Sequence, residues 1–259
     1  MDRDLLQVIR DTERNLPKKH MTAQEVEGPF GGAMDFSADP RLSIVTAQYI
    51  WGGEPNENGG EMGGMKALDY KYNLNKPIEL NETDWYPWGY RGDKIAASRV
   101  EAWEFLVGGG SGFNHLNGLF TPEDPAGNDP DNQKLLGTLK ALKQFLYSFD
   151  FLKMRQDKTV VAGGLGAQGV YCRAISEPGK QYALYIHHSR DRRGSYTVVP
   201  GNYHEQLALR LPSGDYRAEW VEPATGKVIG NEEFSHGGGN RILKAPAYSV
   251  DIALRIKAR

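Results

Sequence analysis

Hydrophobic and polar positions divide the chain into two parts with different periodicity. In the first ~150 residues, four segments carry apolar side chains at helical spacing: residues 2–16, 65–74, 93–107 and 132–149. Four shorter runs alternate with them and are typical of strands, the second being more hydrophobic than the first: residues 20–26, 42–51, 76–82 and 111–117. Pro17 ends the first of the predicted helices, and the run Gly108-Gly-Gly110 ends the helix over 93–107. This alternation predicts a parallel α/β architecture.

From about residue 158 the period changes to two. Apolar and polar residues alternate in residues 181–187, 206–211, 216–221 and 249–255. Turn residues separate the runs at 177–180, 212–215 and 223–227, and Gly237-Gly-Gly239 also reads as a turn. About seven short strands with this spacing predict a small antiparallel β-sandwich. We therefore expect an α/β domain over 1–155 and an all-β domain over 156–259.

Composition excludes several classes of function. Lys and Arg number 31 against 33 Asp and Glu, so no basic excess favours nucleic acid or an anionic membrane. No run approaches the ~18 apolar residues of a membrane span, and the charged start MDRDLLQVIRDTERN lacks the apolar centre of a signal peptide. The single cysteine, Cys172, permits no internal disulfide and no Cys-based zinc site, and we expect it to be buried and inert.

No sequence feature indicates a metal or a cofactor. His187 and His188 are adjacent on an alternating strand, so their side chains should point to opposite sides and cannot both bind one ion. Neither glycine triplet has the strand and helix context of a phosphate loop.

Polar and aromatic residues gather where the four predicted parallel strands end. In a β/α barrel the C-terminal strand ends and the loops after them form the active face. The gathered residues are Gln24, Glu25 and Glu27; Tyr49 and Trp51; Asn81, Glu82, Asp84 and Trp85; and Asn114, His115 and Asn117.

Glu82 is the strongest catalytic candidate in this group. It closes an alternating strand and is followed by the aromatic loop Thr-Asp-Trp-Tyr-Pro-Trp, which could stack on a sugar ring. A glycosidase needs one carboxylate at the anomeric carbon and a second that protonates the leaving oxygen, about 5–5.5 Å apart in retaining enzymes. A solvated or ion-paired carboxylate is the alternative for Glu82.

Three segments resemble the second half of the apiosidase-like barrel family of glycoside hydrolases: residues 76–82, 99–110 and 149–154. The resemblance implies the C-terminal half of a (β/α)₈ barrel, strands five to eight, with Glu82 as the nucleophile that ends strand seven. Residues 177–185, 214–220 and 225–227 resemble the domain that usually follows this barrel and is named for collagen binding. The family also suggests a secreted or periplasmic protein.

The resemblance places the general acid/base at the end of strand four, before the first helix of this chain. Glu25 and Glu27 follow strand five and do not match that position. We therefore expect this chain to carry the nucleophile of the catalytic pair without its general acid/base.

Other candidates for the site have less specific signals. Tyr49 could orient the nucleophile through a hydrogen bond that favours its charged form, or it could be a wall or core residue. Trp51, Trp85 and Trp88 could stack on substrate, whereas Trp103 and Trp220 belong in the core. Asn114 and His115 could bind substrate hydroxyls or simply support a turn.

Two functions remain open at this point. The first is a retaining glycosidase, or a piece of one, that acts on O-glycosyl bonds of a plant or matrix polysaccharide. The second is a non-catalytic carbohydrate- or matrix-binding protein. In both, the unpaired edges of four β/α units favour self-association.

Overall fold

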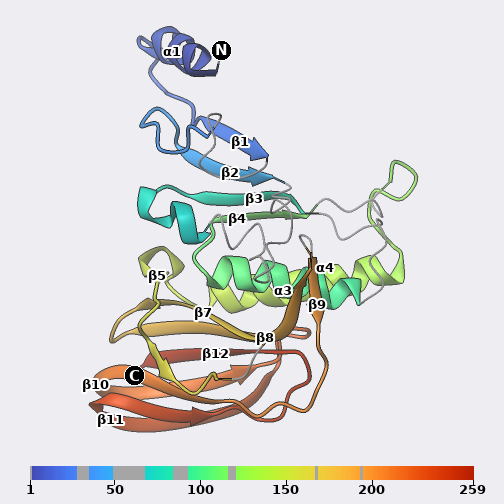
Figure 1. Cartoon of the computed structure of the whole chain (residues 1–259), viewed down its shortest axis with the longest axis vertical. Helices are drawn as coiled ribbons and strands as arrows, with labels where there is room; N and C mark the ends of the chain where they lie inside the picture. Colours follow the sequence, from blue (N-terminus) through green and yellow to red (C-terminus); the bar gives the residue numbers. More distant parts are fainter. Residues whose placement is uncertain are drawn as a thin grey trace.

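The computed structural model describes residues 2–27, 35–48, 68–83, 93–115, 121–166, 169–192 and 195–259. Its first part contains a four-stranded parallel sheet in the order β1-β2-β3-β4 (Figure 1). The strands are β1 (Ala23–Glu27), β2 (Ile44–Gln48), β3 (Ile78–Thr83) and β4 (Gly112–His115). All three strand pairs are parallel, so the predicted parallel α/β architecture is confirmed.

Helices alternate with these strands as expected. They are α1 (Asp2–Glu13), α3 (Lys94–Val107) and α4 (Pro130–Tyr147). Residues 68–71 are also helical and continue into the short 3₁₀ helix η1 (Tyr72–Leu74), whereas residues 65–67 of that predicted helix lie outside the described residues. Asp93 caps α3 by accepting a hydrogen bond from the backbone N–H of Ala96 at 2.9 Å. Gly109, at φ +104°, ends it in a conformation that favours glycine.

The second part is an antiparallel sheet whose main path runs β11-β10-β12-β8-β7-β5. After the 3₁₀ helix η2 (Phe151–Lys153), its strands are β5 (Arg155–Gln156), β6 (Val161–Gly163), β7 (Val170–Glu177), β8 (Gln181–Arg192), β9 (Ser195–Val198), β10 (Gln206–Val221), β11 (Val228–Lys244) and β12 (Asp251–Ala258). Strand β6 pairs with β10, and β9 pairs with β8. The antiparallel arrangement is confirmed, but hydrogen bonds connect the main path as one sheet, so the sandwich stays a prediction.

Two predicted turns in this sheet are wrong. Residues 212–215 lie inside the 16-residue strand β10, and Gly237–Gly239 lie opposite them in β11. Among the described strands, β12 reaches β10 only from Tyr216 onward and β6 only at Ala208 and Leu209. Pro212 therefore has a strand on one side only, where its missing N–H is tolerated. The predicted turns at 177–180 and 223–227 are confirmed.

The helices α3 and α4 lie between the two sheets (Figure 1). One cluster of buried side chains joins α3 to the parallel sheet: Val45, Ala47, Leu68, Ile78, Leu80, Ala97, Val100 and Phe105. A second cluster joins α3 and α4 to the antiparallel sheet and includes Trp103, Phe145, Ile175, Tyr185 and Ala253. A third fills the other side of the antiparallel sheet and includes Trp220, so Trp103 and Trp220 are core residues as predicted.

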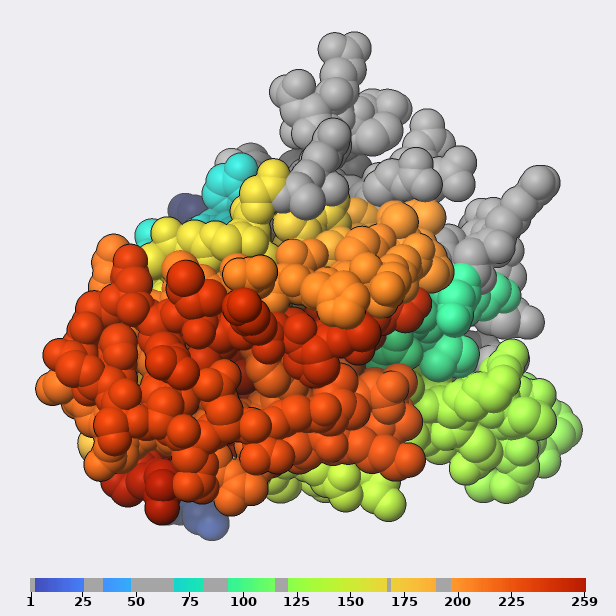
Figure 2. Space-filling view, turned by 90° about the horizontal axis from the view of Figure 1, so that it is seen from below, coloured from blue at the N-terminus to red at the C-terminus, as the bar shows by residue number. Residues whose placement is uncertain are grey.

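Figure 2 views the molecule from the side of the antiparallel sheet. The long strands β10 to β12 (orange to red) cover most of this face, and the residues that lead into α4 (green) project beside them. No helix within the described ranges is both long and apolar enough to span a bilayer.

Helix α3 carries charged residues into the buried contact with the antiparallel sheet. Arg99 donates two hydrogen bonds to Asp251 of β12, at 2.8 and 2.9 Å, and the Tyr185 hydroxyl donates to the same carboxylate at 2.7 Å. The side chains of Arg99 and Asp251 are only 10% and 5% exposed. Burial alone would lower the pKa of Arg99, but the Asp251 carboxylate raises it overall, so the guanidinium keeps its positive charge inside the protein.

Replacing Asp251 with Asn should destabilise the protein by about 3–5 kcal/mol, because Arg99 would be left buried without its counter-charge. Urea unfolding followed by tryptophan fluorescence measures this change. Lys134→Gln breaks the exposed pair with Asp131 and should change the free energy of unfolding little. Equal effects of the two substitutions would contradict the importance of the buried pair.

Candidate functional site

The parallel sheet has one side packed on α3 and another side that carries polar residues. In β3, Ile78 and Leu80 belong to the cluster with α3. Side chains alternate along a strand, so Glu79 and Asn81 lie on the opposite side. By the same alternation, Val45 and Ala47 of β2 face α3 and Thr46 faces the polar side. In a β/α barrel this polar side is the interior.

Register places the polar residues in two rows. Glu25, Thr46, Glu79 and Gly112 are paired successively across the four strands. One step further toward the C-terminal ends, the backbones of Glu27, Gln48 and Asn81 are paired. A Cβ added at Gly112 would lie 3.3 Å from the Glu79 Cγ, so the Glu79 side chain lies over this glycine. The polar side therefore contains acidic and amide groups near the strand ends.

A chain of hydrogen bonds crosses the strand ends. The Asn114 Nδ2 of β4 donates to the Asn81 Oδ1 of β3 at 2.7 Å. The Asn81 Nδ2 donates in turn to the Glu25 Oε1 of β1 at 2.6 Å. These bonds join three strands and fix the orientation of the Asn81 amide, because its oxygen and its nitrogen have different partners.

A β-bulge lies at the end of β3. Leu80 pairs with Phe113 and Thr83 with His115, so Asn81 and Glu82 together lie opposite the single residue Asn114. A bulge of this kind interrupts the side-chain alternation and is common at barrel rims and beside active sites. Without it, alternation would assign Glu82 to the same side as Leu80, the side that packs on α3.

The structure describes only some of the predicted site residues. The backbone of Glu82 is in β3 and that of His115 in β4, but their side chains lie outside the described part of the chain. Asn114 is described and contacts Asn81. Tyr49, Trp51, Trp85 and Trp88 lie outside the described residues.

The sequence predicts no role for Asn81 or Glu25, although both belong to the strand-end group. Their position at the ends of parallel strands was the available signal. This position does not predict the hydrogen bond between the two side chains, because β1 and β3 are not adjacent and the bond reaches across β2.

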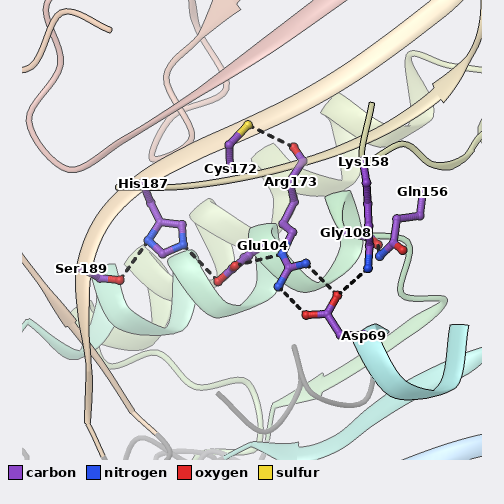
Figure 3. Close-up of polar contacts among 9 residues, drawn as sticks. All are labelled: Asp69, Glu104, Gly108, Gln156, Lys158, Cys172, Arg173, His187 and Ser189. Atoms are coloured by element: carbon purple, nitrogen blue, oxygen red, sulfur yellow. Dashed lines mark hydrogen bonds and ion pairs between the residues drawn. The ribbon is translucent and has the colours of Figure 1, made fainter. Parts of the chain in front are cut away.

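A second polar cluster lies between α3 and the antiparallel sheet (Figure 3). The His187 ring is 3.0 Å from the Glu104 carboxylate through Nε2 and 3.0 Å from the Ser189 hydroxyl through Nδ1. Glu104 also pairs with Arg173 at 3.3 Å, and Arg173 donates two hydrogen bonds to Asp69 at 3.0 Å. His187 and Ser189 are fully buried, so this Ser-His-Glu chain has a structural role and no access to a substrate.

His188 faces the other side of β8, as its adjacency to His187 predicts. Its Nε2 lies 2.9 Å from the Tyr248 hydroxyl and 3.1 Å from the Glu205 carboxylate. The two histidines thus have separate partners and do not form a shared metal site.

No protein-family model matches the chain, and no curated protein matches it. Solved structures do match, and two of them with TM-scores above 0.6 are described as glycoside hydrolases. A structure described as a glycoside hydrolase has a TM-score of 0.63 and 17% identity over 98% of this chain and 60% of its own length. A family 5 glycoside hydrolase from Bacteroides vulgatus has a TM-score of 0.64 and 16% identity over 97% of this chain and 59% of its own.

A more distant match is a family 27 β-L-arabinopyranosidase from Geobacillus stearothermophilus, crystallised with arabinose. Its TM-score is 0.50 at 8% identity, over 99% of this chain and 54% of its own length. At such identities the likeness concerns the fold. The chain thus has a glycoside hydrolase-like fold and spans about three fifths of the length of the first two matched proteins.

Cys172 should be unreactive in the folded protein. Burial, with the Glu104 carboxylate adding to it, raises the pKa of this thiol to about 12, so almost no thiolate exists at pH 8. The folded chain should react with Ellman's reagent at least ~100-fold more slowly than the urea-unfolded chain. Equal rates would show that the thiol is accessible and ionised and would restore it as a candidate nucleophile.

Proposed function

We propose that this protein is a retaining glycosidase, or the part of one that carries the nucleophile, and that Glu82 is that nucleophile. The observation that carries the proposal is the bulge at Asn81 and Glu82. It lies at the C-terminal end of a parallel strand, on a fold shared with glycoside hydrolases. Catalytic residues of β/α barrels occupy such strand ends.

We assign the four parallel strands to positions five to eight of a (β/α)₈ barrel. The coverage of about 60% of the two matched glycoside hydrolases supports this assignment, because it leaves room in those proteins for further β/α units. The general acid/base then belongs to a unit outside this chain. The division into a partial barrel over 1–155 and a second domain over 156–259 is part of the same proposal.

The chemistry follows the double displacement of retaining enzymes. A Glu82 carboxylate oxygen attacks the anomeric carbon while the bond from that carbon to the leaving oxygen breaks, and the acid/base donates a proton to the leaving oxygen. The resulting glycosyl ester is cleaved when water attacks the same carbon and gives its proton to the acid/base. Glu82 leaves as a carboxylate. The substrate is an O-glycosidic bond of a polysaccharide.

The residues around Glu82 would bind the sugar. Asn114 is already oriented by its bond to Asn81 and would contact a hydroxyl, with His115 beside it on β4. We assign Tyr49 to the orientation of the nucleophile, and Trp51 and Trp85 to stacking on the ring. Membership of the apiosidase-like family, and of the domain named for collagen binding that usually follows its barrel, stays a prediction.

Covalent trapping tests the nucleophile without the missing acid. A 2,4-dinitrophenyl 2-deoxy-2-fluoroglycoside has a leaving group that departs as an anion and needs no proton, while the fluorine slows hydrolysis of the ester. Incubating the chain with a panel of such glycosides should add one glycosyl group, which peptide mass spectrometry should locate on Glu82.

Glu82→Gln should abolish the adduct, and Glu233→Gln on the distant strand β11 should leave it unchanged. An adduct on another carboxylate, or one that survives Glu82→Gln, would refute the assignment. So would the absence of an adduct with every sugar of the panel.

A further inference from the structure

The hydrogen-bond chain Asn114–Asn81–Glu25 ends on a carboxylate. Each asparagine donates an N–H along the chain, from Asn114 to Asn81 and from Asn81 to Glu25. The last acceptor is the Glu25 Oε1, and the Glu25 side chain is exposed at the strand ends. The backbone of the proposed nucleophile Glu82 lies opposite Asn114 in the register of these strand ends.

Glu25 has no ion-pair partner among the residues that the structure describes. Its carboxylate accepts a hydrogen bond from the neutral Asn81 amide, so no described cation neutralises its charge. Glu79, paired with the same Thr46, adds a second carboxylate on this side of the sheet. In the segment that leads into β3, Lys71 pairs with Asp35, and Lys76 donates to the backbone oxygens of Ser37 and Asp39.

This arrangement discriminates between classes of sugar. A carboxylate accepts hydrogen bonds from neutral hydroxyl groups, which donate to it readily. A sugar that carries its own carboxylate or sulfate brings a second negative charge beside Glu25 and the proposed nucleophile. Like charges at a shared site repel and oppose binding.

We propose that Glu25 is a specificity-determining residue and that the sugar over the Asn114–Asn81–Glu25 chain is uncharged. The site would accept neutral glycans and reject uronic acids and sulfated sugars. The proposal rests on the proposed function, because it assumes that a sugar occupies this face. It narrows the substrate to glycans whose reacting unit has no acidic group.

The experiment compares sugars that differ only in charge. The full chain, labelled with ¹⁵N, is titrated with D-galactose and D-galacturonate, and with D-glucose and D-glucuronate. The side-chain amide signals of Asn81 and Asn114 report binding, and each is identified by its loss in Asn81→Ala or Asn114→Ala. Neutral hexoses should shift these signals, and the uronates should bind at least about tenfold more weakly, which corresponds to about 1.4 kcal/mol.

Two tests attribute the difference to Glu25. Glu25→Gln keeps an oxygen for the Asn81 amide but removes the charge. The ratio of the uronate dissociation constant to that of the matching neutral hexose should therefore fall to within about threefold. Glu233→Gln removes the same charge far from the site and should keep the wild-type ratio. In the wild type, raising the salt concentration should also lower this ratio of dissociation constants, because ions screen the repulsion between Glu25 and the uronate carboxylate.

Three results would overturn the proposal: a uronate that binds as tightly as its neutral partner, a ratio that Glu25→Gln leaves unchanged, or hexoses that do not move the two amide signals. Covalent trapping at Glu82 tests the proposed function independently of the role of Glu25. It needs only a neutral fluorosugar and the carboxylate of Glu82. Trapping with no discrimination would refute the role of Glu25 alone. Discrimination without trapping would refute the nucleophile and retain the binding site.

Discussion

The burial of α3 between two different sheets is the constraint on which the rest of the structure depends. Its apolar residues pack on the parallel sheet on one side and on the antiparallel sheet on the other. The Arg99 and Glu104 side chains of this helix are buried and must therefore pair inside the protein. Arg99 does so with Asp251, and Glu104 with Arg173 and His187 (Figure 3). An unpaired charge at either place would cost more than the apolar contacts around it can recover. The antiparallel sheet is therefore attached to the parallel sheet through the buried helices α3 and α4 and through specific ion pairs.

This attachment bears on the proposed site because α3 follows the strand that carries Glu82. The helix fixes Ile78 and Leu80 on its own side of β3, and this in turn places Glu79 and Asn81 on the polar side. The bulge then changes the alternation at Glu82. The hydrogen bonds from Asn114 to Asn81 and from Asn81 to Glu25 hold the same strand end from the polar side. The backbone of Glu82 is thus held at a strand end that packs on α3 on one side and carries the amide hydrogen bonds on the other.

Much of this fold could be predicted from local patterns, and the rest could not for physical reasons. Helical spacing and Asp93 with Gly108-Gly-Gly110 predict α3 well, because periodicity and capping are local. The predicted turns at 212–215 and at Gly237–Gly239 are wrong because Pro, Ser and Gly are typical of turns. The sequence does not show that Pro212 has a neighbouring strand on one side only, where a proline is tolerated in a strand. The partners of Arg99 and Glu104 lie 152 and 69–83 residues away, and no local pattern reveals them. In the candidate site, strand-end clustering selects Glu82 and Asn114, whose roles stay predictions, whereas the bulge and the bond from Asn81 to Glu25 depend on register between strands.

The central claim is that a sugar is held over the ends of these parallel strands and attacked there by Glu82. The most direct measurement is a crystal structure of the chain after reaction with a 2-deoxy-2-fluoroglycoside. The account predicts continuous electron density from a Glu82 carboxylate oxygen to the anomeric carbon, with the ring hydroxyls toward Asn114 and Glu25. Density for the sugar on another residue, or a ring bound away from the ends of β1, β3 and β4, would contradict it.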